Sequence, residues 1–140
     1  MKVLLPVDGS AHTQKALDYL FSHPGLLGAE PEFVVLNVQL PIPPRAARAV
    51  GREMVESYHH AEAEAVLDPV RKFLTERGAR FTTRMVVGHA AEEILKLAEA
   101  EHVDLIVMGS RGHGPFRALV MGSVVQRVVA GAHVPVMVIH

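Results

Sequence analysis

Five short apolar runs divide the chain, and most of them are rich in β-branched residues, as buried strands are. They are VLLPV (3–7), FVVLNV (33–38), FTTRMVV (81–87), DLIVM (104–108) and VPVMVI (134–139). The run 81–87 alternates between apolar and polar positions more than the others do. This alternation predicts a strand at the edge of a sheet.

Apolar residues at helical spacing fill the segments between these runs, which predicts amphipathic helices. The first helix ends at His23-Pro24-Gly25, a typical stop signal. The second is long, and its apolar stripe predicts the side that faces the core: Val50, Met54, Tyr58, Ala61 and Ala65. Two more helices carry the stripes Ile94, Leu95, Ala98 and Val124, Val125, Val128, Val129.

Two proline-containing places depart from ideal patterning. Pro69 removes a hydrogen bond inside the long helix, so we expect a kink there or a restart capped by Asp68. The proline-rich segment QLPIPPRAARAVG (39–51) is predicted to be a loop that leads into this helix.

Strands that alternate with helices are typical of an α/β domain built on a parallel sheet, and right-handed crossovers place helices on both faces. A length of 140 residues fits one domain, so we expect residues 1–140 to fold as a single unit.

The net charge of −1 and the absence of tryptophan argue against a nucleic-acid partner. No apolar run approaches the roughly 20 residues of a membrane span, and the apolar N-terminal run is too short for a signal peptide. Together with the absence of cysteine, this favours a cytoplasmic protein without a membrane partner.

Ligands of open parallel sheets bind beyond the carboxyl ends of the strands, where the strand order reverses. The residues that follow the strands are therefore candidates, and they include Asp8, Val38, Gly88 and the glycine-rich stretch 108–126. In this stretch Ser123 and Gln126 have the spacing of a capping box, which predicts a helix that begins at Ser123. A helix N-terminus behind glycine-lined amides predicts a phosphate site.

Other phosphate-binding motifs are missing, because the chain has neither G-x-x-x-x-G-K-[ST] nor G-x-G-x-x-G. Asp8 has no second acid beside it in the sequence, so no catalytic constellation is predicted, and its alternative role is to cap the turn or first helix. His60 and Glu64 lie one helical turn apart, but without a third ligand they predict no metal site.

The glycines Gly109, Gly112 and Gly122, with Ser123, follow the spacing G-x2-G-x9-G-[ST]. With the blocks VLLPVDGS, VVGHAAEEILKLAEAEHVDLIVMGSRG and GSVVQRVVAGAHVPVMVIH, the chain resembles the ATP-binding universal stress proteins along its whole length. The resemblance implies an open, twisted, Rossmann-like five-stranded sheet in the order 3-2-1-4-5.

The resemblance also implies ATP as the ligand, with Mg²⁺. Pro6 and Val7 would border the adenine, and Val38 would contact it through its main chain. Asp8, Met108 and Gly109 would lie along the ribose. The phosphates would be held by Gly112, Gly122, Ser123 and Val124, with Arg111 and His113 as basic auxiliaries. The chain departs from the family pattern at Asn37, where relatives often have histidine, and at Val125, where many have a small polar residue.

The last apolar run would form an edge strand that invites pairing with another chain. We therefore expect a homodimer through antiparallel pairing of Val136–Ile139, as the resemblance also implies. The predicted function is that of a nucleotide-dependent stress regulator or sensor with an unknown downstream protein partner and at most slow hydrolysis. The alternatives are a slow ATPase or phosphotransferase, and a dimeric interaction module with a vestigial pocket.

Overall fold

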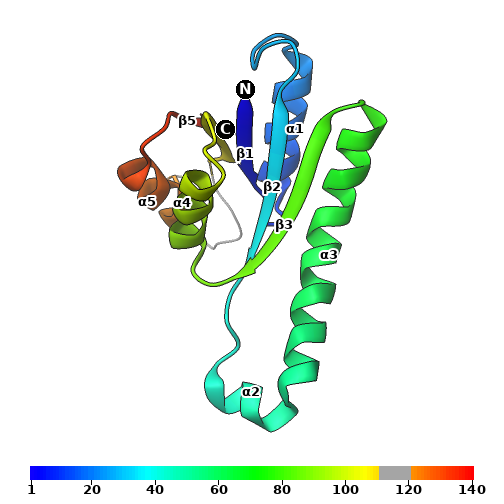
Figure 1. Ribbon diagram of the computed structural model, residues 1–140, viewed down its shortest axis with the longest axis vertical. Coiled ribbons are helices and arrows are strands. Elements are labelled where there is room, and N and C mark those ends of the chain that lie inside the picture. The colour runs from blue at the N-terminus through cyan, green and yellow to red at the C-terminus, as the bar shows by residue number, and fades with distance from the viewer. Residues whose placement is uncertain (111–120) are drawn as a thin grey trace.

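A computed structural model describes residues 1–110 and 121–140, and its centre is a parallel sheet of five strands in the order β3-β2-β1-β4-β5 (Figure 1). The strands are β1 (Lys2–Pro6), β2 (Glu32–Gln39), β3 (Arg80–Val87), β4 (Leu105–Gly109) and β5 (Val136–Ile139). The predicted fold class and strand order are confirmed. The run that alternates most, β3, lies at one edge, as predicted.

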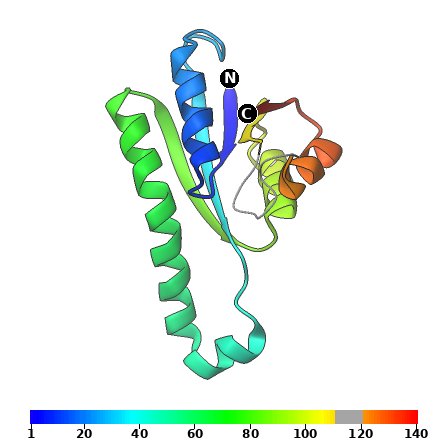
Figure 2. The same cartoon turned by 180° about the vertical axis from the view of Figure 1, so that it is seen from behind.

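Helices cover both faces of the sheet (Figures 1 and 2). On one face α1 (Ala11–Ser22) and α3 (Arg52–Glu76) pack on side chains such as Leu5 and Val35. On the other face α4 (Ala90–Ala100) and α5 (Ser123–Gly131) pack on Leu4 and Ile106. Leu4 and Leu5 are successive residues of β1 and point to opposite faces, so the central strand contributes to both cores. Full burial of such a side chain stabilises the fold by about 1.5–3 kcal/mol.

The segment 39–51 contains a helix, although the sequence predicts a loop there. Helix α2 (Pro44–Val50) begins at a proline, and no residue of it is buried. Proline suits the first helical position because its missing N–H would have no partner there. Gly51, with φ of 89°, separates α2 from α3. The prolines therefore start a helix here.

Helix α3 runs unbroken through Pro69, so the predicted restart is wrong. Leu67 and Val70 on either side of the proline are 1% and 4% exposed, and both pack in the core, which stabilises the helix on each side of Pro69. Arg71 donates hydrogen bonds to Glu64 and Asp68, so its side chain joins residues before and after Pro69. The hydrogen bond from Arg71 holds the pKa of Glu64 below its usual value.

The predicted core-facing stripe of α3 is also wrong, because it faces solvent. Val50, which lies in α2, is 53% exposed, and Met54 and Tyr58 of α3 are 60% and 51% exposed, whereas Ala63 and Leu67 are buried. At about 100° per residue, the stripe lies roughly opposite the buried side of the helix. The first turns of α3 extend past the carboxyl ends of the strands, so no sheet lies there to bury the stripe (Figure 1).

Replacing the proline inside α3 provides a test of this account of the helix. Pro69→Ala restores a backbone donor to an intact helix, so we expect the free energy of unfolding to rise by about 1–3 kcal/mol. Pro44→Ala is the matched control, because Pro44 lies at a first helical position where proline costs nothing. Urea unfolding of both variants measures the effect. An equal change in the free energy of unfolding for Pro69→Ala and Pro44→Ala would contradict this account of α3.

Candidate functional site

The strand order reverses between β1 and β4, and two segments far apart in the chain meet beyond these strand ends. Ser110, directly after β4, donates its N–H to the carbonyl of Ile139 at 2.8 Å. Its own carbonyl accepts the N–H of Gly122 at 2.9 Å. This second bond fastens the start of α5 to the end of β4. It brings Met108 and Gly109 to the same edge of the sheet as Gly122 and Ser123.

The N-terminus of α5 has no side-chain cap, so the predicted capping box is wrong. Gly122 is the N-cap, Ser123 is the first helical residue, and no side chain of the described residues caps the first-turn amides. Gln126 donates its side-chain amide to the carbonyl of Met121 at 2.7 Å, outside the helix. The first intrahelical bond runs from Gln126 N to Gly122 O. The N–H groups of Ser123, Val124 and Val125 therefore have no helical partner, and the positive end of the helix dipole is open.

Asp8 follows β1 and organises the turn into α1. Its Oδ1 accepts the backbone N–H of Ser10 at 2.9 Å and the hydroxyl of Thr13 at 3.3 Å. Ser10 is the N-cap of α1, so Asp8 fixes the turn rather than capping the helix itself. The residue is exposed, which leaves the carboxylate at the surface of the site.

Val38 presents main-chain groups to a gap beside β1. Gly88 N bonds to Gln39 O, so the main chain of Gln39 faces β3, and that of Val38 faces the β1 side by alternation. Strand β1 ends at Pro6, opposite Leu36, and no strand residue lies across from Val38. Pro6, the last residue of β1, and Val7, which follows it, lie beside this gap. The predicted base-contacting residues are thus brought together.

Gly109 is required by packing inside the protein. A Cβ at this position would lie 2.7 Å from the Cβ of His12 and 2.8 Å from its backbone oxygen. The close approach lets the first turn of α1 rest on the end of β4. The sequence interpretation connected this glycine with a ligand and missed its contact with α1.

The similarity to known proteins covers the whole chain. A family profile described as "Universal stress protein family" matches residues 1–140. The chain belongs to the universal stress protein family.

Individual relatives agree with this assignment. Universal stress protein MJ0531 of Methanocaldococcus jannaschii is 30% identical over 138 residues, which are 99% of this chain and 81% of that protein. Universal stress protein Slr1230 of Synechocystis is 32% identical over 136 residues, 97% of this chain, and this chain spans only 41% of Slr1230.

Solved structures share the fold. The structure of MJ0577 from M. jannaschii superimposes with a TM-score of 0.78 and 28% identity, over 99% of this chain and 94% of that one. A universal stress protein family protein from Arabidopsis thaliana with AMP bound has a TM-score of 0.71, over 99% and 90% of the two chains. At 20% identity, the Arabidopsis likeness concerns the fold alone.

In this universal stress protein several polar residues near the site are buried, and the sequence interpretation gave most of them no role. Asn37, Ser110, Ser10 and His12 are 2%, 1%, 7% and 8% exposed. The hydroxyls of Ser10 and Ser110 have no hydrogen-bond partner among residues 1–110 and 121–140. The position of Asn37 inside the apolar run FVVLNV was a signal that could have identified it, whereas Ser10, His12 and Ser110 lie outside the apolar runs.

Three predicted residues, Arg111, Gly112 and His113, lie outside the described residues. Within the described part of the chain, no group of three or more histidine, aspartate or glutamate side chains is placed to hold a metal ion. None of the helices in that part is both long and apolar enough to cross a membrane.

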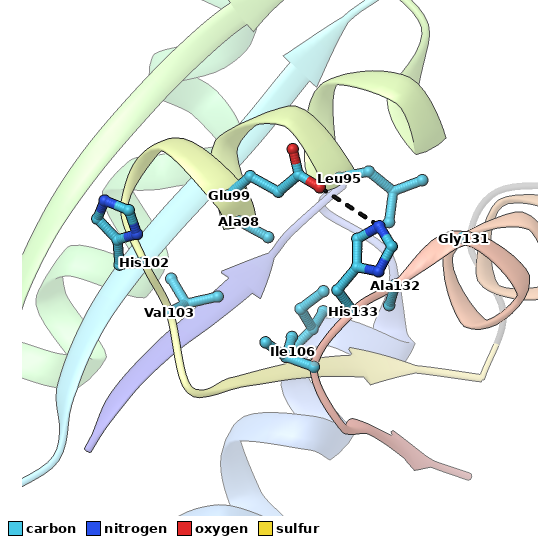
Figure 3. A pocket seen from close by; sticks show the side chains of 10 residues that line it. Leu95, Ala98, Glu99, His102, Val103, Ile106, Gly131, Ala132 and His133 are labelled. Atoms are coloured by element: carbon cyan, nitrogen blue, oxygen red, sulfur yellow. Dashed lines mark ion pairs between the residues drawn. The ribbon is translucent and has the colours of Figure 1, made fainter.

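A cavity of about 400 Å³ lies at the opposite end of the sheet, between the last turns of α4 and α5 (Figure 3). Its walls include Leu95, Val103 and Ile106, and Glu99 and His133 face each other across it at 3.5 Å. No predicted site residue is among its described lining residues. The cavity is separate from the candidate site.

The packing of Gly109 generates a prediction about stability. Gly109→Ala should lower the free energy of unfolding by about 1–3 kcal/mol, because the new methyl group meets the backbone of His12. Gly88→Ala is the matched control at another strand end, since its methyl group meets only the flexible side chain of Glu93. Urea unfolding compares the two. A loss as large for Gly88→Ala as for Gly109→Ala would contradict the packing role.

Proposed function

We propose that residues 1–140 form a single universal-stress-type domain that binds ATP at the carboxyl ends of β1 and β4. The observation that carries the proposal is the bond from Gly122 N to Ser110 O, 2.9 Å long. This bond sets an uncapped helix N-terminus directly beside the end of a central strand. Unpaired N–H groups and a positive dipole end at such a place favour a phosphate group.

The phosphates would lie at the start of α5. The amides of Ser123 and Val124 have no helical partner, and Gly122 has no side chain to obstruct them. A serine cap would have occupied one of these amides, so the glycine cap found in the structure suits an anion better than the predicted capping box. Arg111, Gly112 and His113 would complete the cradle, as the resemblance implies.

The adenosine would lie across β1 and β2. The open main-chain groups of Val38 suit a planar base with adjacent donor and acceptor atoms, and Pro6 and Val7 would border it. Asp8, Met108 and Gly109 would run along the ribose. Mg²⁺ would be held mainly by phosphate oxygens and water, with the exposed Asp8 reached through water, because Mg²⁺ commonly keeps several waters.

We further propose that this protein acts in the cytoplasm as a nucleotide-dependent stress regulator, read by a downstream protein rather than by nucleic acid or a membrane. The charge balance of the chain supports this choice of partner. Hydrolysis would be slow at most, since Asp8 already uses one carboxylate oxygen to hold the turn into α1. A faster ATPase or phosphotransferase, and an interaction module with a vestigial pocket, are the competing functions.

Calorimetric titration of nucleotide-free protein with Mg-ATP, and then with AMP, tests the proposal. We expect one ATP per chain with a Kd in the micromolar range and much weaker AMP binding, because AMP lacks the phosphates that reach α5. Gly122→Val should weaken ATP binding at least tenfold, since a branched side chain fills the phosphate space.

Gly78→Ala serves as the control for this titration, because Gly78 follows α3 at the amino end of β3, where its φ of 66° makes the substitution strain the backbone away from the candidate site. If Gly122→Val binds ATP as tightly as the parent does, the phosphate assignment is wrong. If the parent gives neither ATP heat nor thermal stabilisation, the vestigial-pocket alternative holds. Rapid release of inorganic phosphate from ATP would indicate that the protein is an ATPase.

We also propose that this protein forms a homodimer through β5. This strand forms one edge of the sheet, and its neighbour in the sheet is β4. The carbonyl of Pro135 accepts the N–H of Ile106 in β4, and the carbonyl of Ile139 accepts the N–H of Ser110 directly after β4. By alternation, the main-chain groups of Val136 and Val138 face away from β4. An apolar edge with open donors and acceptors suits antiparallel pairing of Val136–Ile139 with a second copy.

Two substitutions of one edge residue test the dimer. Val138→Asp and Val138→Pro should both shift the protein toward monomer, the first by charge and the second by removing an outward N–H. Val129→Asp is the control, because Val129 lies on α5 and is 49% exposed. Sedimentation equilibrium measures the mass. If the parent and both Val138 variants have the same mass, the interface is wrong.

A further inference from the structure

The hydrogen-bond ladder between β1 and β2 ends in an unusual way. Pro6 pairs with Leu36, and Val7 N donates to Leu36 O at 2.8 Å. In a parallel ladder the next bond would run from Val38 N to Val7 O. That bond is not formed between these two described residues.

The side chain of Asn37 takes the place of this bond. Its Nδ2 donates to Val7 O at 3.0 Å, and Asn37 is 2% exposed. Its Oδ1 accepts the side-chain amide of Gln39 at 2.7 Å. The carbonyl of Val7 is therefore satisfied without Val38, and the Asn37 amide is held at both ends in one orientation.

Because Asn37 takes this place, the N–H and the C=O of Val38 on the β1 side have no hydrogen-bond partner among residues 1–110 and 121–140. An apolar side chain at position 37 would remove this donor, and the N–H of Val38 is the donor that a continued ladder would bring to the carbonyl of Val7. An unpaired buried carbonyl costs about 1–3 kcal/mol, which would favour one more rung of ladder. Such a rung would consume the N–H of Val38 and narrow the gap between β1 and β2.

We propose that Asn37 is a positioning residue for base recognition, which holds the edge of Val38 open for adenine. This inference rests on the proposed function, because it explains how the same site would select its base. Adenine carries an acceptor at N1 beside a donor at its 6-amino group. These match an N–H and a C=O of one strand residue. Hypoxanthine has a donor at N1 and an acceptor at O6, so both contacts become unfavourable.

The donor chemistry of the side chain at this position decides which variants should keep the role. A ring N–H is a donor, as the asparagine amide is, whereas alanine and aspartate donate nothing at neutral pH. Asn37→His is therefore the conservative variant that should retain the function. Asn37→Ala and Asn37→Asp should lose it.

Hydrogen exchange of the Val38 amide tests the inference without any nucleotide. In the parent and in Asn37→His we expect fast exchange, since the amide has no partner. In Asn37→Ala we expect exchange at least tenfold slower, because the amide then bonds to Val7 O. Slow exchange in the parent, or equal exchange in parent and Asn37→Ala, would overturn the proposal.

Base selectivity provides the second measurement. Calorimetry of the parent should show Mg-ATP binding at least tenfold tighter than Mg-ITP, the hypoxanthine analogue. In Asn37→Ala and Asn37→Asp the ATP affinity should fall about tenfold and the ratio of ATP to ITP affinity should approach one. Asn37→His should restore the preference, which a purely structural role would not require.

Val35→Ala is the matched control for lost stability. Val35 is a fully buried residue of the same strand, so its truncation destabilises the fold but leaves Val38 untouched. Its ATP to ITP ratio should equal that of the parent. A ratio in Asn37→Ala that also equals the parent ratio would overturn the role of Asn37. If the parent binds no ATP, the proposed function fails alone, and the exchange measurement still decides whether Asn37 holds the edge open.

Discussion

In the interior of a parallel sheet, away from its edge strands, backbone donors and acceptors go unpaired where a strand stops, and this protein places its candidate site at such stops. Strand β1 ends at Pro6 while β2 continues to Gln39, which leaves Val38 facing a gap. Helix α5 begins at a glycine cap, which leaves first-turn amides open. The bond between Gly122 and Ser110 aligns these two sets of unpaired groups on one edge of the sheet. Much of the candidate site is therefore main chain, and side chains act chiefly by leaving room or by holding the backbone in place.

The fold was predictable from the sequence because its signals are repeated and redundant. Each strand is an apolar run of its own, and the central strand is buried on both faces, so no single residue decides the architecture. The order of strands came from the family resemblance, since periodicity alone does not specify which strands are neighbours. The residues at the strand ends could be identified from the sequence because the carboxyl ends of all parallel strands lie at one edge of the sheet.

The wrong predictions share a physical cause, which is that a local pattern does not reveal what lies opposite it. The stripe of Met54 and Tyr58 has core spacing, but the sheet does not reach that far along α3. Ser123 and Gln126 have capping-box spacing, yet the bond from Gly122 to Ser110 moves the cap one residue earlier. The contact of Gly109 with His12, and the bond from Asn37 to Val7, join elements that are distant in the chain. Such contacts leave no trace in sequence spacing.

The central position of β1 also has a consequence for the order of events during synthesis. Lys2 donates its backbone N–H to Asp104 across 102 residues of chain, and β4 joins β1 directly after this contact. Within this sheet β1 is made before the other four strands, yet it gains its second neighbour only when β4 has been made. A chain still attached to the ribosome cannot form the crevice between β1 and β4 until β4 has emerged. A ligand held there can bind only after β1 and β4 have paired, so it would stabilise the assembled sheet rather than aid the first steps of its folding.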